Sequence, residues 1–339
     1  MTINLKQLSK LLKLSPTTVS RALADYPDVS AKTRARVKQM AIQHGYQPNP
    51  VARRLQKGKT ETIGIVITPE QNYFSDTFFI DLLSGISNQI TRAGYELILG
   101  VASDEEHEMQ SMRRMVEGKR VDGMILTLIR EQDPRVGYLL DRDFPFVLYG
   151  RTRETRPYAF VDMDGKQAFE KACTYLAGLG HRRIALLNGE PGFMFPVGCR
   201  EGYESGLFLS GLELDPDLIR EWKHKDPSQS SYRWTLELFK NDNPPTAILF
   251  QTEAVNGIFK GLDELNLQPG KDVALIGYDD LEIARIHRPS LSVLRPQARE
   301  AGQRVVNILM EVIKGEDPGK FQEIHQVEMV IRETSLPPS

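Results

Sequence analysis

Four polar side chains close to the N-terminus offer the clearest chemistry in this sequence: Thr17, Thr18, Ser20 and Arg21. They follow Ser15-Pro16, a capping side chain and a proline at the first helical position, which together predict the start of a helix. Apolar residues at helical spacing in the same segment turn toward a core, so the four polar side chains face outward. Hydroxyls bind phosphates and an arginine can bridge a guanine edge, so this is the composition of a recognition helix for DNA.

Two further helices are predicted around this segment. The leucines of residues 5–12 have helical spacing after Asn4, and only two residues separate this helix from the one that begins at Pro16. Ser30 is expected to cap a third helix over residues 31–44, which Gly45 ends. Such a short link is what a helix-turn-helix requires, so we predict a small all-α headpiece over residues 1–48.

Charge divides the chain into a basic head and an acidic body. Residues 1–59 carry 12 Lys and Arg against two acids, whereas the remaining residues carry 31 basic and 43 acidic side chains. This layout is typical of a protein whose head meets a polyanion, although a basic solvated surface is the alternative on composition alone.

A second start signal, Asn49-Pro50, opens a basic stretch that contains Arg53, Arg54 and Lys57. A helix here has about two turns, shorter than the roughly 12 to 15 residues that an isolated helix needs. We therefore expect residues 49–60 to be a hinge helix and linker that orders only against DNA or a second copy of the chain. An ordinary charged linker remains the alternative.

From residue 61 onward, short apolar runs alternate with helix-length amphipathic segments. Expected strands cover residues 62–68, 95–101, 123–128, 145–149, 183–188, 247–251 and 273–277. Alternation of this kind predicts parallel sheets covered by helices on both faces. Because residues 61–339 exceed one sheet of ordinary size, we expect an α/β core of two doubly wound parallel-sheet lobes, with a ligand cleft at the carboxyl ends of the strands.

Several function classes are disfavoured. Phosphate-binding, dinucleotide-binding, hydrolase and zinc-protease motifs are absent, and the glycine-rich and basic stretch 178–184 precedes a strand, so it is predicted to be a helix-to-strand turn. Cys173 and Cys199 show no spacing typical of disulfides or metal sites. With no long apolar run and no secretory signal, we expect a cytoplasmic protein without catalytic residues, metal or cofactor.

The head resembles the headpiece and hinge of the lac/gal repressor (LacI/GalR) family of transcription regulators. The resemblance rests on Leu14-Ser-Pro-Thr-Thr-Val-Ser-Arg-Ala-Leu23 and on residues 29–34, 45–49 and 52–55. It implies that Thr17 and Arg21 read bases while Thr18 and Ser20 hold phosphates, and that Pro16 replaces a base-reading side chain. It also implies a hinge helix in the minor groove with Leu55 as an apolar wedge. The hinge contacts it implies are Asn49, Ala52, Arg53, Leu55 and Lys57.

The body continues this resemblance and is similar to two-lobed periplasmic sugar-binding proteins. The matching stretches are residues 120–125, 180–184, 275–280, 289–291 and 332–335. The resemblance implies effector contacts from Phe78, Phe79, Gln251 and Asp279, although one phenylalanine could be core and Asp279 could cap a helix. Cys199 stands where relatives place an arginine; Arg200 or Arg151 is the candidate replacement.

These expectations combine into a homodimeric, sequence-specific repressor of a carbohydrate-utilisation operon. Two heads would read a palindromic operator in double-stranded DNA, and a small molecule between the lobes would control binding allosterically, as inducer or corepressor. A sugar is the first expectation for the effector and a nucleobase the second. A cytoplasmic sugar-binding module without operator function and a carbohydrate-acting enzyme are the rival classes.

Overall fold

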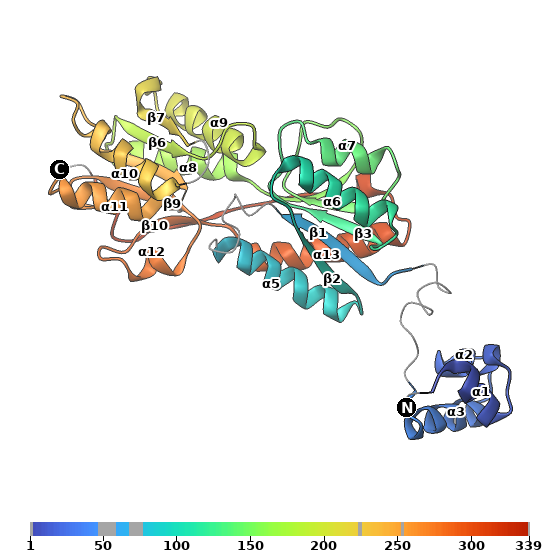
Figure 1. The fold of residues 1–339 in the computed structure, drawn as a ribbon. Coiled ribbons are helices and arrows are strands. Elements are labelled where there is room, and N and C mark those ends of the chain that lie inside the picture. The colour runs from blue at the N-terminus through green and yellow to red at the C-terminus, as the bar shows by residue number, and fades with distance from the viewer. Residues whose placement is uncertain (1–2, 47–58, 68–76, 223–225, 252–253, 338–339) are drawn as a thin grey trace. The chain divides into compact units, whose positions relative to one another are not determined.

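The computed structural model describes residues 3–46, 59–67, 77–222, 226–251 and 254–337 (Figure 1). The chain separates into two compact units, Met1–Thr60 and Glu61–Ser339. Each unit has its own hydrophobic core, and each is described by itself below.

In the described part of the first unit, three helices surround a small core. They are α1 (Leu5–Leu12), α2 (Pro16–Leu23) and α3 (Ala31–Gln43). Asn4 caps α1 with a capping box, while Ser15 and Ser30 each accept a backbone N–H at the start of α2 and α3. Leu8, Leu12, Val19 and Val37 are buried together, so the predicted helix starts and inner faces are confirmed.

The N-terminal lobe of the second unit is a parallel sheet with the order β11-β5-β4-β3-β1-β2. Its strands are β1 (Thr62–Ile67), β2 (Glu96–Val101), β3 (Gly123–Leu126), β4 (Phe146–Tyr149), β5 (Ala159–Met163) and β11 (Gln322–His325). One face packs against α5 (Thr77–Arg92) and α13 (Ala298–Ile313). The other packs against α6 (Glu105–Glu117) and α7 (Pro134–Leu140).

The C-terminal lobe repeats this arrangement with the order β12-β10-β9-β8-β6-β7, in which β12 alone is antiparallel to its neighbour. Its strands are β6 (Ile184–Asn188), β7 (Ile219–Glu221), β8 (Ala247–Gln251), β9 (Ala274–Tyr278), β10 (Ser292–Arg295) and β12 (Glu328–Val330). The helices are α8 (Gly165–Gly178) and α9 (Met194–Leu209) on one face, and α10 (Pro227–Leu238), α11 (Val255–Glu264) and α12 (Glu282–Ile286) on the other.

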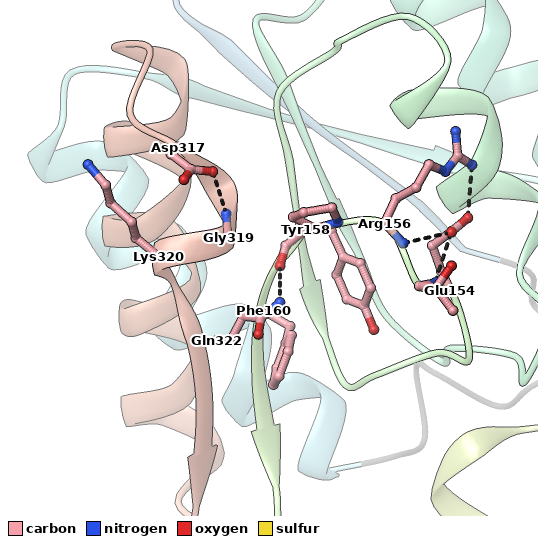
Figure 2. A pocket seen from close by; sticks show the side chains of 10 residues that line it. Glu154, Arg156, Tyr158, Phe160, Asp317, Gly319, Lys320 and Gln322 are labelled. Atoms are coloured by element: carbon pink, nitrogen blue, oxygen red, sulfur yellow. Dashed lines mark hydrogen bonds and ion pairs between the residues drawn. The ribbon is translucent and has the colours of Figure 1, made fainter.

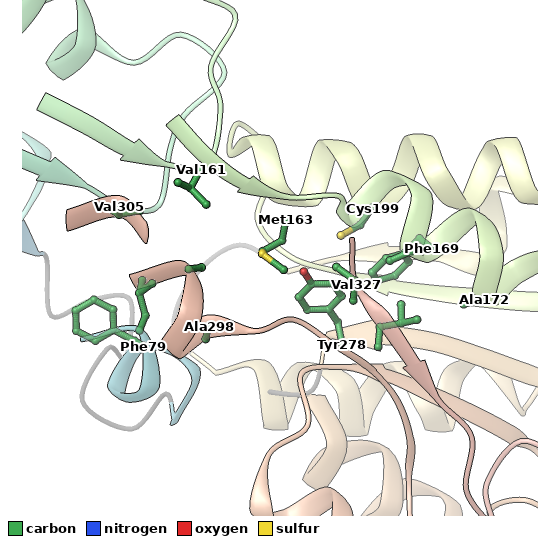
Figure 3. Close-up of a cluster of buried hydrophobic side chains, with 14 of the residues drawn as sticks. Phe79, Val161, Met163, Phe169, Ala172, Cys199, Tyr278, Ala298, Val305 and Val327 are labelled. Atoms are coloured by element: carbon green, nitrogen blue, oxygen red, sulfur yellow. The ribbon is translucent and has the colours of Figure 1, made fainter. Parts of the chain in front are cut away.

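The chain passes between the lobes after β5, after β10 and between β11 and β12. One buried hydrophobic cluster extends across these passages (Figure 3). In Figure 3, Met163 at the end of β5, Tyr278 at the end of β9 and Val327 between β11 and β12 lie close together. The lobes therefore share a core at their junction, while the carboxyl ends of both sheets face a common space.

The expected architecture of two doubly wound lobes is confirmed, and the predicted strands are present with small shifts at their ends. The stretch 178–184 is the predicted turn between α8 and β6. Strands β5, β7, β10, β11 and β12 were not predicted. Strand β5 follows β4 without an intervening helix, and the polar Asp162 interrupts its apolar run, so alternation with helices gave no signal for it.

Candidate nucleic-acid interface and ligand cleft

Helix α2 presents its polar side chains as the sequence predicts. Thr17 and Arg21 are exposed and Thr18 and Ser20 are half-buried, whereas the apolar Val19 is fully buried. The Thr18 hydroxyl lies 2.8 Å from the Ser15 hydroxyl, which also accepts the Thr18 N–H. The start of the helix and the orientation of Thr18 are thus set by one capping residue.

Arg21 is held by groups beyond the end of α2. Its Nε donates to Asp28 Oδ1 at 3.2 Å, and its Nη2 lies 2.8 Å from Asp28 Oδ2. The guanidinium carbon also lies 4.9 Å from the centre of the Tyr26 ring. Exposed contacts of this kind contribute little to stability, but they limit the orientations of the guanidinium before DNA is bound.

The remaining predicted DNA contacts, Asn49, Ala52, Arg53, Leu55 and Lys57, lie outside the described residues. Their roles stay predictions.

A cavity of about 700 Å³ lies between the two lobes at the carboxyl ends of their strands. In doubly wound sheets this edge is where ligands bind. Of the predicted effector residues, the cavity wall includes Phe78, Phe79, Arg151, Gln251 and Asp279. Phe79 is nearly fully buried in the core, while the half-buried Phe78 has its ring 5.8 Å from that of Tyr149.

Arg151 reaches the cleft from the loop after β4 and pairs there with Asp162 of β5. Its Nε donates to Asp162 Oδ2 at 2.5 Å. Burial raises the pKa of the Asp162 carboxyl, and the Arg151 charge opposes that rise. Asp162 was not among the predicted residues; a carboxylate inside a short apolar run is the signal that identifies it.

Asp279 and Gln251 project from neighbouring strands of the C-terminal lobe. Asp279 follows β9 with a left-handed backbone, φ 88°, and its Oδ1 is buried. It does not cap the next helix, because the N-cap of α12 is Leu281. Gln251 ends β8, and its Nε2 lies 3.4 Å from Asn188 Oδ1, which orients the amide at the cleft wall.

Of the two candidate arginines, Arg151 belongs to the cleft wall and Arg200 does not. Its side chain pairs instead with Glu204 at 2.9 Å and Glu221 at 3.2 Å. The orientation of α9 about its own axis explains why Arg200 lies outside the cleft wall. A Cβ on Gly202 would lie 2.0 Å from the Lys166 carbonyl oxygen, so that face of α9 must pack closely on α8. Cys199 is consequently buried, and the next side chain is turned by about 100 degrees.

The lobes also touch directly at the edge of the cleft. Arg130 and Phe193 form an isolated antiparallel bridge, flanked by two backbone hydrogen bonds of 2.9 Å, from Glu131 N to Gly192 O and from Met194 N to Ile129 O. The Arg130 guanidinium carbon lies 5.6 Å from the Phe193 ring centre. These contacts join the loop after β3 to the loop before α9, so they hold the two lobes together.

A second, smaller cavity of about 520 Å³ lies in the N-terminal lobe (Figure 2). It is at the amino ends of β5 and β11, away from the edge where doubly wound sheets bind ligands. Arg156 at its rim is paired with Glu154 at 2.8 Å and Asp141 at 2.7 Å. We assign no ligand to it.

In the parts of the chain that the structure describes, no cluster of His, Cys, Asp and Glu side chains is arranged to hold a metal ion. Among the same residues, no helix is both long and apolar enough to cross a membrane.

A helical head with an outward-facing recognition helix and a two-lobed core with a central cleft define a DNA-binding transcription regulator with a ligand-binding domain. Residues 4–49 match the family described as bacterial regulatory proteins, lacI family, and residues 173–335 match the periplasmic binding protein-like domain. The transcriptional regulator AglR of Rhizobium meliloti is 35% identical, over 99% of this chain and 95% of its own. The chain belongs to the lacI family of bacterial regulatory proteins.

Solved structures share the fold of the whole chain. The lac repressor dimer bound to operator and the anti-inducer ONPF has a TM-score of 0.86 at 22% identity, covering 99% of this chain and 100% of that one. A complex of the transcriptional regulator CelR with cellobiose has a TM-score of 0.75 at 23% identity, covering 98% and 99%. AglR is named as a transcriptional regulator, and this chain, as a member of the same family, is likewise a DNA-binding transcriptional regulator.

Proposed function

We propose that this protein is a sequence-specific repressor of a carbohydrate-utilisation operon, and that a sugar bound between the core lobes controls its affinity for operator DNA. One observation carries the proposal: the same chain combines an outward-facing α2 bearing Arg21 with an interlobe cavity of about 700 Å³ that is lined by aromatic and hydrogen-bonding side chains. Because operator DNA lies in the cytoplasm, we expect the protein to act there.

On the DNA side, a homodimer presents two heads to the halves of a palindromic operator, because a two-fold protein matches a two-fold site. The headpiece comprises residues 1–48, the hinge helix and linker residues 49–60, and the effector-binding and dimerisation core residues 61–339. The division of the chain into compact units at Thr60 supports the last boundary. The relative solved as a dimer on operator DNA supports the mode of binding.

On the effector side, the cleft wall combines Arg151, Asp162 and Asp279 with the ring of Phe78. Charged and amide groups hydrogen-bond to hydroxyls, and aromatic faces pack against the C–H faces of a sugar ring. The complex of the relative CelR with cellobiose supports a sugar. A nucleobase is the second candidate, because the neighbouring rings of Phe78 and Tyr149 could also stack on a base.

The bridge between the lobes supports allosteric control. A ligand in the cleft changes the equilibrium between open and closed lobes only as far as it prefers one of them. Movement of the N-terminal lobe then changes the positions of the hinge and of the heads. Coupling of this kind is typically about 1 to 3 kcal/mol, or roughly 5-fold to 150-fold in operator affinity.

The experiment that tests this function selects the operator from a random DNA library with the full-length protein. Binding of the selected fragment is then titrated with and without a panel of sugars and nucleobases. We expect a palindromic site and a change in affinity of at least 5-fold with one sugar, whose direction identifies an inducer or a corepressor. The proposal would be contradicted if the protein selected no particular DNA sequence from the library. It would also be contradicted if its affinity for the selected fragment changed with nucleobases alone.

A further inference from the structure

Each of the three cations in the described part of the cleft wall pairs with an acid. Arg151 pairs with Asp162 at 2.5 Å, Arg153 with Glu131 at 2.8 Å, and Lys166 with Glu201 at 3.2 Å. Among the residues that form the cavity wall, Arg151, Arg153 and Lys166 balance Asp162, Glu201 and Asp279 in formal charge. The described wall of the cleft therefore has no net formal charge although it is rich in charged groups.

A ligand with a phosphate or a carboxylate needs a free guanidinium, a free ammonium or unsatisfied backbone N–H groups. An anion that binds the other N–H groups of the Arg151 guanidinium would lie beside the largely buried carboxylate of Asp162, and the two negative charges would repel each other. The arrangement of the pairs thus disfavours anionic ligands.

The N-terminus of α9 faces the cleft but offers little to an anion. The Met194 N–H donates to the Ile129 carbonyl, Pro196 has no N–H, and the Val197 N–H donates to the Phe193 carbonyl. Helix N-termini bind anions through free N–H groups, and most of those in the first turn of α9 are already used.

The same groups suit hydroxyls. A hydroxyl both donates and accepts a hydrogen bond, and the Arg151–Asp162 pair offers a donor beside an acceptor, as does the amide of Gln251. Around these polar groups lie apolar surfaces that fit the C–H faces of pyranose rings. They come from Phe78, Tyr149, Met163, Met194 and Phe195.

The size of the cavity indicates more than one ring. At about 30 Å³ for the volume share of a water molecule, a hexose has the bulk of six or seven waters, on the order of 200 Å³. A cavity of about 700 Å³ is much larger than that and matches two or three linked pyranoses.

We propose that the effector is an uncharged oligosaccharide of two or three rings, bound through the paired Arg151 and Asp162 and through Gln251 and Asp279. Sugar phosphates, sugar acids, single hexoses and nucleobases are disfavoured. This inference rests on the proposed function, because it specifies the ligand of the same cleft.

Calorimetry with the full-length protein tests the ligand class. The probes are maltose, cellobiose, melibiose, lactose, sucrose and raffinose, against glucose, galactose, glucose 6-phosphate, galacturonate and hypoxanthine. We expect at least one neutral oligosaccharide to bind at least tenfold more tightly than every single-ring or charged probe. The inference is overturned if no oligosaccharide in this set binds, or if a single-ring or charged probe binds more tightly.

Two substitutions test the charge argument with the best oligosaccharide and with galacturonate. Asp162→Asn should weaken the oligosaccharide by at least tenfold and strengthen galacturonate, because it frees the Arg151 guanidinium. Arg200→Gln is the matched control; it removes a paired arginine outside the cleft wall and should leave both affinities unchanged. If Asp162→Asn, with an unchanged circular dichroism spectrum, left the oligosaccharide affinity intact, the assigned contacts would be wrong.

Operator binding of the same preparations separates the two proposals. If calorimetry contradicts the ligand inference but the protein still binds its operator, the regulator function is unaffected. If the protein binds an oligosaccharide but selects no particular DNA sequence, the repressor function is contradicted. The ligand inference is then unaffected.

Discussion

Arg130 of the N-terminal lobe lies directly opposite Phe193 of the C-terminal lobe in an antiparallel bridge that crosses the edge of the cleft. The backbone hydrogen bonds flank this pair instead of joining it. The side chain of Arg130 is anchored in its own lobe by Glu105 and Glu108, both at 3.1 Å. Opening the cleft must therefore break contacts that connect two otherwise separate loops.

A disulfide at this position should lock the lobes. In antiparallel pairs without direct hydrogen bonds the Cα atoms are about 4.5 Å apart, which is within the range that a disulfide spans. We expect the oxidised Arg130→Cys/Phe193→Cys protein to exclude the effector, so that its operator affinity no longer responds to the sugar. Operator titration with and without dithiothreitol measures this, and the reduced protein should respond again. An oxidised variant with the normal response, or single-cysteine variants that also lose it, would contradict the prediction.

Arg21→Ala should relax base preference at one position in each half-site. A bidentate arginine contact contributes roughly 1 to 3 kcal/mol of discrimination. The measurement is selection of operators from a library randomised at every position. Unchanged preference in this variant would remove Arg21 from the set of base-reading residues.

Lys57→Ala is the control for the loss of one positive charge near DNA. This residue lies outside the described part of the chain, and we predict that it contacts phosphate. Its replacement should weaken binding to all sequences alike and reduce the slope of log affinity against log salt by about one. A change of base preference in this variant would contradict the division between the two roles.

Leu55→Ala should weaken specific operator binding by about tenfold or more, which corresponds to roughly 1.4 kcal/mol. The predicted wedge opens a base step at a free-energy cost that is offset by contacts in the bent duplex. Its removal should therefore reduce the affinity for the operator only. Binding to non-specific DNA and calorimetric binding of the effector should stay normal. Intact operator affinity, or protection of residues 50–56 from amide exchange in the free protein, would argue against a hinge that folds on DNA.

Arg135→Met should destabilise the core by about 3 to 5 kcal/mol, because it removes the ion-pair partner of the buried Asp133 and one of the two arginines that pair with the buried Glu108. Arg135 is nearly fully buried, and its guanidinium donates to Glu108 at 2.6 Å and to Asp133 at 2.6 Å. Urea unfolding of the full-length protein measures the loss. Adding Glu108→Gln and Asp133→Asn should recover much of it, and a triple variant no more stable than the single one would contradict the account.

The same network predicts a dependence of stability on pH. Burial acts to raise the pKa of Asp133, but the hydrogen bonds and charge of Arg135 outweigh it, so the pKa lies below its ordinary value. The ionised carboxylate therefore stabilises the fold above the ordinary aspartate pKa of about 3.9, and this contribution is lost as the pH falls through the lower folded value. In Asp133→Asn, the acid dependence of unfolding should be weaker.

Much of the DNA-reading head could be predicted because its signals are local. Ser15, Pro16 and the spacing of Val19 specify where α2 begins and which face is buried, all within two turns of helix. The alternation of apolar runs and helices likewise indicated two parallel sheets and a cleft at their carboxyl ends. The family resemblance added Phe78, Gln251 and Asp279, and the structure places all three on the cleft wall.

Tertiary structure decided what depends on the relative placement of elements. The choice of Arg151 over Arg200 followed from the packing of α9 on α8 at Gly202, which the position of an arginine in the sequence does not reveal. Asp162 could be recognised as the partner of Arg151 only from the pairing of β4 with β5. Caps and periodicity act over a few residues and can be read from the chain itself, whereas ion pairs and cavities arise only where distant segments meet.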